Sequence, residues 1–218
     1  MNLKRLFQIQ EELDNAIVEK KGLQGRNLLS ERILALQVEL GECANEWRGF
    51  KFWKQNPLPQ TKKEIECTTC NGTGDENYEA NFESLMEEKG SVPHKECTSC
   101  NGSGIAGYKN PLLEEYVDCL HFFLSIGISI GHTDFEAWEY SYTKDETKQF
   151  LAVFGQIDNI RIIFEDKDNI EPDDCVVYET AFAHFLALGK MLGFTWGEIE
   201  QAYLQKNEIN HKRQETGY

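Results

Sequence analysis

The sequence predicts an all-α protein that carries one small inserted module. In six segments the apolar residues recur at steps of three and four, the spacing of a helix with one buried face. Outside residues 59–107, no segment shows the alternation of apolar and polar residues that is typical of a half-buried strand. Residues 59–107 are instead polar, rich in glycine and hold four of the seven cysteines.

The first predicted helix covers residues 2–20 and ends before Gly22 and Gly25. Its buried stripe is formed by Leu3, Leu6, Gln10, Leu13 and Ile17. The second helix is expected to begin at Ser30, as its N-cap, and to run to Trp47, with Gly49 ending the regular pattern. The remaining helices are expected at residues 111–130, 144–164, 172–192 and 195–210.

The position of the Cys-rich segment indicates an insertion into the helical domain. Glu42 and Glu115 are 73 positions apart, and 49 of these belong to residues 59–107. The 24 that remain suit two antiparallel helices joined by a short loop. We therefore expect residues 1–58 and 108–218 to form one helical domain, with 59–107 as a separate module.

Two acidic motifs, each on a predicted helix, point to a metal site. Glu39 and Glu42 are three positions apart, as are Glu115 and Asp118, so each pair shares one helix face. An isolated pair of this kind is usually a solvated surface feature, but both helices are otherwise strongly apolar. Because clustered carboxylates repel one another and oxygen ligands suit hard cations, the four side chains predict a Mg²⁺ site. Glu46, one helical turn beyond Glu42, is a further candidate for a metal ligand or a catalytic base.

Charge and hydropathy narrow the class of function. The formal net charge of −15 argues against a nucleic-acid binder, since binding to phosphate backbones needs clustered Lys and Arg. A small phosphorylated ligand accompanied by Mg²⁺ escapes this objection, because the metal reverses the local field. The longest strongly apolar stretch, residues 119–130, is too short to span a bilayer, so we expect no membrane association and a cytoplasmic location.

The cysteines of the insertion form two copies of one motif. Cys67-Thr-Thr-Cys70-Asn-Gly-Thr-Gly and Cys97-Thr-Ser-Cys100-Asn-Gly-Ser-Gly are nearly identical and resemble the CxxCxGxG elements of DnaJ-type chaperones. Two such turns supply the four thiolates of a structural Zn²⁺ site, which we favour over a redox pair. The module either stabilises a long loop or presents a surface to a protein partner.

The two acidic motifs and two further segments resemble the dimeric all-α dUTPases, relatives of the MazG-like NTP pyrophosphatases. The segments are LQVELGECANEWRGFKFW in the second helix and the C-terminal tail, which fits KNxxNxxRQxxGY. The resemblance implies a homodimeric helical bundle that hydrolyses dUTP to dUMP and pyrophosphate, a reaction of nucleotide-pool sanitation. It also implies dUTP or dUDP as the small-molecule substrate. The insertion departs from the family's usual spacing between the acidic motifs.

The resemblance also assigns roles to single residues. It implies that Glu39, Glu42, Glu115 and Asp118 hold Mg²⁺ and that Trp53 walls the base or sugar pocket. In the tail, Lys206, Asn210 and Arg213 follow steps of four and three, so an ammonium, an amide and a guanidinium share one helix face and suit phosphate oxygens. The tail match adds Gln214 and Tyr218 to the substrate-binding set.

Recognition of the base is expected from the first helix. Gln10 stands where an apolar residue is expected, and its amide can both donate to and accept from an imide edge such as that of uracil. The resemblance gives Gln10 this role, with Asp14 one turn later; the alternative is a core Gln bonded to backbone. Two other functions stay open: a pyrophosphatase for another nucleotide such as dCTP, and a non-enzymatic adaptor that uses the zinc module.

Overall fold

The computed structural model describes residues 2–86, 90, 92–141, 143–164 and 170–216 of the 218-residue chain. The chain divides into two compact units, Met1–Pro59 with Leu112–Tyr218, and Gln60–Pro111. Each unit is described below by itself.

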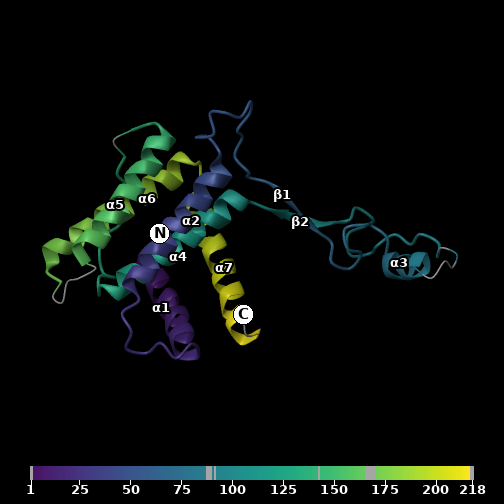
Figure 1. Cartoon of the computed structure of the whole chain (residues 1–218), viewed down its shortest axis with the longest axis horizontal. Coiled ribbons are helices and arrows are strands. Elements are labelled where there is room, and N and C mark those ends of the chain that lie inside the picture. The colour runs from purple at the N-terminus through teal and green to yellow at the C-terminus, as the bar shows by residue number, and fades with distance from the viewer. Residues whose placement is uncertain (1, 87–89, 91, 142, 165–169, 217–218) are drawn as a thin grey trace. The chain divides into compact units, whose positions relative to one another are not determined.

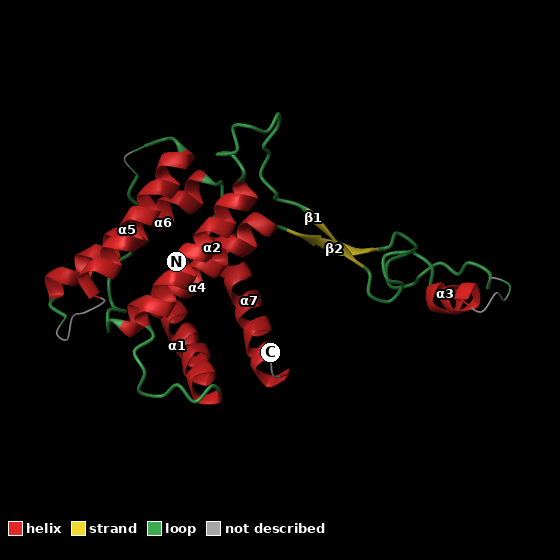
Figure 2. Cartoon of the chain, viewed as in Figure 1, coloured by secondary structure: helices red, strands yellow, loops and turns green. Residues whose placement is uncertain are grey.

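The first unit is built from helices, as the sequence predicts (Figures 1 and 2). They are α1 (Leu3–Lys20), α2 (Leu29–Trp47), α4 (Pro111–Ser129), α5 (Glu146–Phe164), α6 (Pro172–Met191) and α7 (Trp196–Thr216). Helix α5 packs on α6 and α2, and α1 packs on α7. The all-α fold class is therefore confirmed, and α7 is longer than expected because its helical pattern continues past Asn210.

The ends of α2 differ from the prediction. The helix begins at Leu29, so Ser30 lies inside it, and the N-cap residue is Leu28, which makes no side-chain cap bond. The Asn27 side chain, one residue earlier, accepts a hydrogen bond from the Leu29 N–H at 3.0 Å. At the other end Arg48, not Gly49, adopts the left-handed conformation, with φ 65°. Gly49 is required for another reason, because a Cβ there would lie 2.2 Å from the Trp47 ring.

Helix α4 is held against α6 by two buried tyrosines. The Tyr116 hydroxyl donates to the Phe185 carbonyl at 3.1 Å, and the two rings stack with centroids 4.3 Å apart. The Tyr178 hydroxyl donates to the Phe123 carbonyl at 2.9 Å. Gly189 permits the first contact, since a Cβ at that position would stand 2.3 Å from the Tyr116 hydroxyl. These contacts fix α4, and with it the second acidic motif.

The second unit is small and has a different construction. Strand β1 (Lys63–Glu66) pairs antiparallel with β2 (Ile105–Lys109), with Lys63 opposite Lys109 and Glu66 opposite Ile105. Between the strands lie the two cysteine motifs and the short helix α3 (Tyr78–Met86). Among its described residues, the buried hydrophobic side chains are those of the four cysteines, with Tyr78 packed against them.

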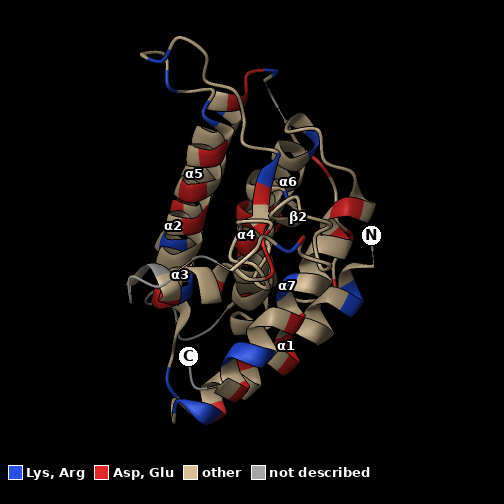
Figure 3. Cartoon of the chain, turned by 90° about the vertical axis from the view of Figure 1, so that its right-hand side faces the viewer, with Lys and Arg blue, Asp and Glu red and all other residues tan. Residues whose placement is uncertain are grey.

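The surface carries the net charge of −15 as acidic positions that recur along the helices (Figure 3). Among the described helices, no single one is long and apolar enough to cross a bilayer, although α6 and α7 pass that test as a pair bent by 107°.

We expect Gly189→Ala and Gly155→Ala to change stability in opposite directions. A Cβ at Gly189 collides with Tyr116 and disrupts its hydrogen bond, a cost of about 1–3 kcal/mol by the usual scale of overpacking. Gly155, in α5, has open space around its Cβ position, so alanine should stabilise that helix by roughly 1 kcal/mol. Urea denaturation of both variants measures this, and equal effects would contradict the close α4–α6 contact.

Candidate active site

The two acidic motifs meet across the first unit. One carboxylate oxygen from each of Glu39 and Glu42 on α2 and Glu115 on α4 lies within 4.8 Å of the others. Asp118, one turn beyond Glu115, has a different partner: its Oδ2 accepts a hydrogen bond from Lys206 Nζ of α7 at 2.5 Å. The structure thus brings three of the predicted metal ligands together, and it pairs the fourth, Asp118, with the ammonium group of Lys206.

Burial and neighbouring charges raise the pKa values of three of these carboxylates, those of Glu39, Glu115 and Asp118. Burial, then the charges of Asp118 and Glu42, raise the pKa of Glu39 to about 7, and Lys206 opposes the shift. The pKa of Glu115 rises to about 7 by burial and by the charges of Asp118, Glu42 and Glu39. Burial also raises the pKa of Asp118, against the effect of Lys206. The site is therefore short of positive charge, which a divalent cation would supply.

A cavity of about 230 Å³ adjoins the acidic group and is formed by four helices. Its lining residues are Gln10, Leu13, Asp14, Ile17, Glu39, Asp118, His121, Phe122, Ser125, Lys206, Asn210 and Arg213. Glu39 and Asp118 thus belong both to the acidic motifs and to the cavity wall. The cavity joins one end of the carboxylate group to the basic face of α7.

Gln10 lies in the cavity wall, but its amide is already engaged. Its Nε2 donates to Asp14 Oδ1 at 2.8 Å and to Ser125 Oγ at 3.1 Å. Its Oε1 accepts from the Tyr203 hydroxyl at 2.9 Å and lies 2.7 Å from His121 Nδ1. All of these partners are side chains, so Gln10 is not the core residue bonded to backbone that the alternative expected. In this conformation, its amide N–H groups are already used and do not point into the cavity as free donors.

Asp14 is held by an ion pair from a neighbouring helix. Arg32 on α2 places its Nη2 3.0 Å from Asp14 Oδ2, and the Ser125 hydroxyl donates to Asp14 Oδ1 at 3.0 Å. Burial raises the pKa of Asp14, and the Arg32 charge opposes that shift. The carboxylate acts as an internal acceptor that links α1, α2 and α4 beneath the cavity.

Three predicted tail residues do share one face, since Lys206, Asn210 and Arg213 all line the cavity. Arg213 Nη1 donates to Asn210 Oδ1 at 3.5 Å. Gln214 is not among the lining residues, and its Oε1 is buried with no hydrogen-bond partner in the described part of the chain. Tyr218 lies outside the described residues.

Two other candidates lie away from the cavity in this structure. Trp53 is 61% exposed and contacts the rings of Phe50 and Phe52 rather than the cavity lining. Glu46 is half-buried and stands outside the group formed by Glu39, Glu42 and Glu115. Its position one turn beyond Glu42 leaves it beside this group along α2 rather than within it.

The structure adds His121, Ser125, Tyr203 and Arg32 to the site, none of which the sequence singled out as a site residue. A signal was present for two of them: Asp118, His121 and Ser125 follow steps of three and four along an otherwise apolar helix. Burial, reinforced by the Lys206 charge, lowers the pKa of His121 to about 3, so its ring is neutral at neutral pH. Tyr203 and Arg32 carried no local signal, because their roles depend on tertiary contacts.

We expect the metal-free chain to lose stability as the pH rises from about 4.5 to about 7. Glu39 and Glu115 hold protons in the folded chain over this range and release them on unfolding, so the folded state is favoured at the acid end. Glu115→Gln removes one of the repelling charges and should flatten the dependence of the melting temperature on pH. Exposed Glu12→Gln is the control; a wild-type profile that is flat over this range would refute the proposed repulsion.

Comparison with known families gives one match. A search of curated proteins finds no similar sequence. The family model described as dUTPase matches residues 2–69 and 106–218, which include both acidic motifs, Gln10 and the C-terminal tail. The residues that it leaves out, 70–105, hold three of the four clustered cysteines. Because the match covers most of the chain and the fold is helical, the chain belongs to the all-α dUTPase family.

Proposed function

We propose that this chain hydrolyses dUTP to dUMP and pyrophosphate with the help of Mg²⁺. One observation carries the proposal: carboxylates from α2 and α4 converge beside a cavity whose wall also bears Lys206, Asn210 and Arg213. Acidic ligands for a cation and basic donors for phosphate then face the same space. Family membership supports the reaction in general, and the geometry supports the division of labour given below.

The residues present fit a hard divalent cation. All three members of the group offer oxygen, and burial with mutual repulsion raises the pKa values of Glu39 and Glu115. The metal would be held by Glu39, Glu42, Glu115 and Asp118. Glu46 would be either a further ligand or a base that acts through one of these ligands. When bound, Mg²⁺ would neutralise phosphate charge and make the α-phosphoryl group and a water molecule more reactive.

Glu39 is the carboxylate best placed to accept a proton from the attacking water. Of the three grouped carboxylates, it alone lines the described cavity, so it faces both the metal position and the substrate. A bound cation would lower the pKa of Glu39 from its value of about 7 in the unliganded chain, so the carboxylate would be ionised and able to accept a proton near neutral pH. Glu42 and Glu115 keep it oriented through the ligand group that they share.

In the unliganded chain, Lys206 supplies the positive charge beside Asp118 until substrate binds. Its ammonium lies 2.5 Å from Asp118 Oδ2, and both side chains are largely shielded from solvent. A cation at the acidic group would compete for Asp118 and release Lys206 toward the phosphates. Asn210 and Arg213, one and two turns further along the same face, would then extend the phosphate-binding surface.

The cavity suits the base and sugar rather than the whole nucleotide. Its volume of about 230 Å³ is below the roughly 300–1,000 Å³ of common ligand pockets. Leu13, Ile17 and Phe122 give it apolar walls for a ring, and Gln10 with Asp14 forms the polar side. The triphosphate would lie outside, along the acidic group and α7. Gln214, Tyr218 and Trp53 stay hypotheses for substrate contact after a rearrangement.

We also propose that the chain acts as a homodimer. Leu34 and Val38 lie one turn apart on α2 and are 62% and 50% exposed, an apolar face on the helix that carries the first acidic motif. A second copy would cover this face. The dimer implied by the sequence resemblance therefore has a surface to form on.

Two alternative functions would use different parts of the chain. A pyrophosphatase for another nucleotide such as dCTP would use the same carboxylates and differ in the polar side of the cavity. A non-enzymatic adaptor would instead use the Cys-rich unit, where Phe82 and Met86 of α3 are exposed one turn apart. The converging carboxylates favour an enzyme, because an adaptor has no use for their repulsion.

Pyrophosphate release from a panel of nucleoside triphosphates with Mg²⁺ tests the proposal. We expect dUTP to be preferred and Asp118→Asn or Glu42→Gln to lower its turnover by roughly 10²–10³-fold, the scale of losing one preorganised electrostatic group. Asp158→Asn, on the surface of α5, is the control. Preference for dCTP would favour the first alternative, and no release from any nucleotide would favour the adaptor.

A further inference from the structure

The two cysteine motifs fold as near copies of one another and exchange backbone hydrogen bonds. The Cys67 N–H donates to the Gly104 carbonyl at 2.8 Å, and the Cys97 N–H donates to the Gly74 carbonyl at 2.9 Å. Gly74 and Gly104 have φ of 76° and 74°, and a Cβ on either would stand about 2.2–2.3 Å from a carbonyl oxygen of the other motif. Each motif therefore requires glycine where it approaches the other.

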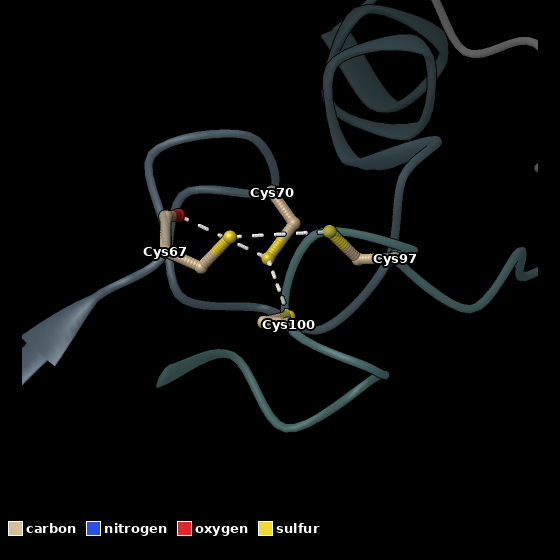
Figure 4. A group of neighbouring side chains, drawn as sticks. All are labelled: Cys67, Cys70, Cys97 and Cys100. Carbon is tan, nitrogen blue, oxygen red and sulfur yellow. Dashed lines mark hydrogen bonds between the residues drawn. The ribbon is translucent and has the colours of Figure 1, made fainter. Parts of the chain in front are cut away.

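The four thiols converge on one point (Figure 4). The sulfur atoms of Cys67 and Cys97 are 3.9 Å apart, those of Cys70 and Cys100 are 3.7 Å apart, and all four lie within 4.8 Å of one another. Zn–S bonds of about 2.3 Å in a tetrahedron place sulfur atoms about 3.8 Å apart. A disulfide would need about 2.05 Å. The spacing fits a shared metal ion rather than a redox pair.

Backbone amides are aimed at two of these sulfur atoms. The Gly74 N–H donates to Cys70 Sγ at 3.2 Å, and the Gly104 N–H donates to Cys100 Sγ at 3.2 Å. Such bonds stabilise negative charge on the sulfur, so they favour the thiolate form that binds metal. Apart from the four cysteines, no buried apolar side chain is found among the described residues from 60 to 110, and the buried Pro111 that ends the unit is the first residue of α4. A unit of this size without an apolar core needs another source of stability.

We propose that Cys67, Cys70, Cys97 and Cys100 bind one Zn²⁺ and that this ion is what folds the Gln60–Pro111 unit. The family model leaves out three of these four cysteines, and none of the four belongs to the acidic group or to the cavity lining, so this site is additional to the proposed active site. The metal takes the place of the missing core, while the helical unit folds on its own apolar core.

The full chain, purified under reducing conditions, should contain about one Zn²⁺ per chain by elemental analysis. Replacement by Co²⁺ should give the intense visible absorption of tetrahedral thiolate coordination. Cys70→Ser should lower zinc affinity at least tenfold and expose residues 60–111 to protease, with the helical circular dichroism retained. Cys175→Ser, a buried cysteine of α6, is the control and should keep its zinc.

Three results would overturn this proposal. They are reduced protein that takes up no zinc when zinc alone is added, Cys70→Ser protein that binds zinc as tightly as wild type, and disulfides that join these cysteines in freshly prepared protein. Because the wild-type metal content and the Co²⁺ spectrum need no variant, misfolding of Cys70→Ser leaves the test intact.

A second, independent observation concerns His121. Its ring is 5% exposed, lines the cavity and stacks on Tyr203 with centroids 4.2 Å apart. The Asp14 carboxylate can only accept, so it fixes the Gln10 amide with Nε2 toward Asp14 and Oε1 toward His121. His121 Nδ1, 2.7 Å from that oxygen, must then carry the hydrogen. The other nitrogen, Nε2, is left as an acceptor with no partner among the described residues.

We propose that Nε2 of His121 accepts a hydrogen bond from the bound nucleotide, either from the ring N–H of a uracil-type imide or from a sugar hydroxyl. This inference rests on the proposed function. It moves direct recognition from Gln10 to His121 and makes Gln10 a positioning residue that sets the tautomer. Cytosine, whose ring N3 is an acceptor, would place two lone pairs face to face if the base is the donor.

Nitrogen-15 NMR of the free protein tests the tautomer without any turnover. We expect His121 to be neutral with its hydrogen on Nδ1, and we expect Nε2 to shift when dUMP is added. N3-methyl-dUMP should abolish the shift if the base is the donor, and 2′,3′-dideoxy-UMP should abolish it if the sugar is. His184, buried in α6 and away from the cavity lining, is the control.

Kinetics with matched substrates provide the second arm. The two modified substrates are the triphosphates of N3-methyl-deoxyuridine and of 2′,3′-dideoxyuridine. In the wild type, kcat/KM for dUTP should exceed kcat/KM for one of them by about tenfold or more, and His121→Phe should bring this ratio of kcat/KM values near one. A hydrogen on Nε2 in the free protein, or a ratio that His121→Phe leaves unchanged, would overturn the role of His121. Failure of the proposed function would appear differently, as a correct tautomer with no pyrophosphate release.

Discussion

Repulsion among carboxylates that α2 and α4 bring together is the constraint on which the helical unit depends. Glu39 and Glu42 stand on α2, and Glu115 stands on α4, whose position is fixed by Tyr116 and Tyr178 against α6. In the unliganded chain, the pKa values of Glu39 and Glu115 rise to about 7, and Lys206 forms an ion pair with Asp118. A cation with a phosphorylated ligand would remove the cause.

The same helices would couple the proposed metal site to recognition of the nucleotide. Asp118, His121 and Ser125 lie on one face of α4, so the ligand group and the polar side of the cavity share one rigid element. Helix α7 brings Lys206 to Asp118 and Tyr203 to Gln10. A shift of α7 on substrate binding would therefore change two contacts of the cavity wall, Lys206 with Asp118 and Tyr203 with Gln10. This arrangement explains how a chain of net charge −15 can accept an anion.

Much of the fold could be predicted from sequence, because helical periodicity is strong and local. The spacing within each acidic motif predicts that its two carboxylates share a helix face, and their place on strongly apolar helices leads us to expect that all four converge; three of them, Glu39, Glu42 and Glu115, do so. The pairing of Asp118 with Lys206 and the internal use of the Gln10 amide could not be predicted, because both depend on side chains 88 and more than 100 positions away. Arg48 as the left-handed residue was missed because glycine, the usual residue there, stands next to it for a steric reason.

Proton release on cation binding tests the central claim most directly. Mg²⁺ would be titrated into the full chain near pH 6.5 by calorimetry, in two buffers that differ in their enthalpy of ionisation. If carboxylates with pKa values of about 7 are the ligands, binding should release protons, on the order of one per ion, and the apparent enthalpy should differ between the buffers. Absence of binding, or binding with the same enthalpy in both buffers, would contradict the account of this site.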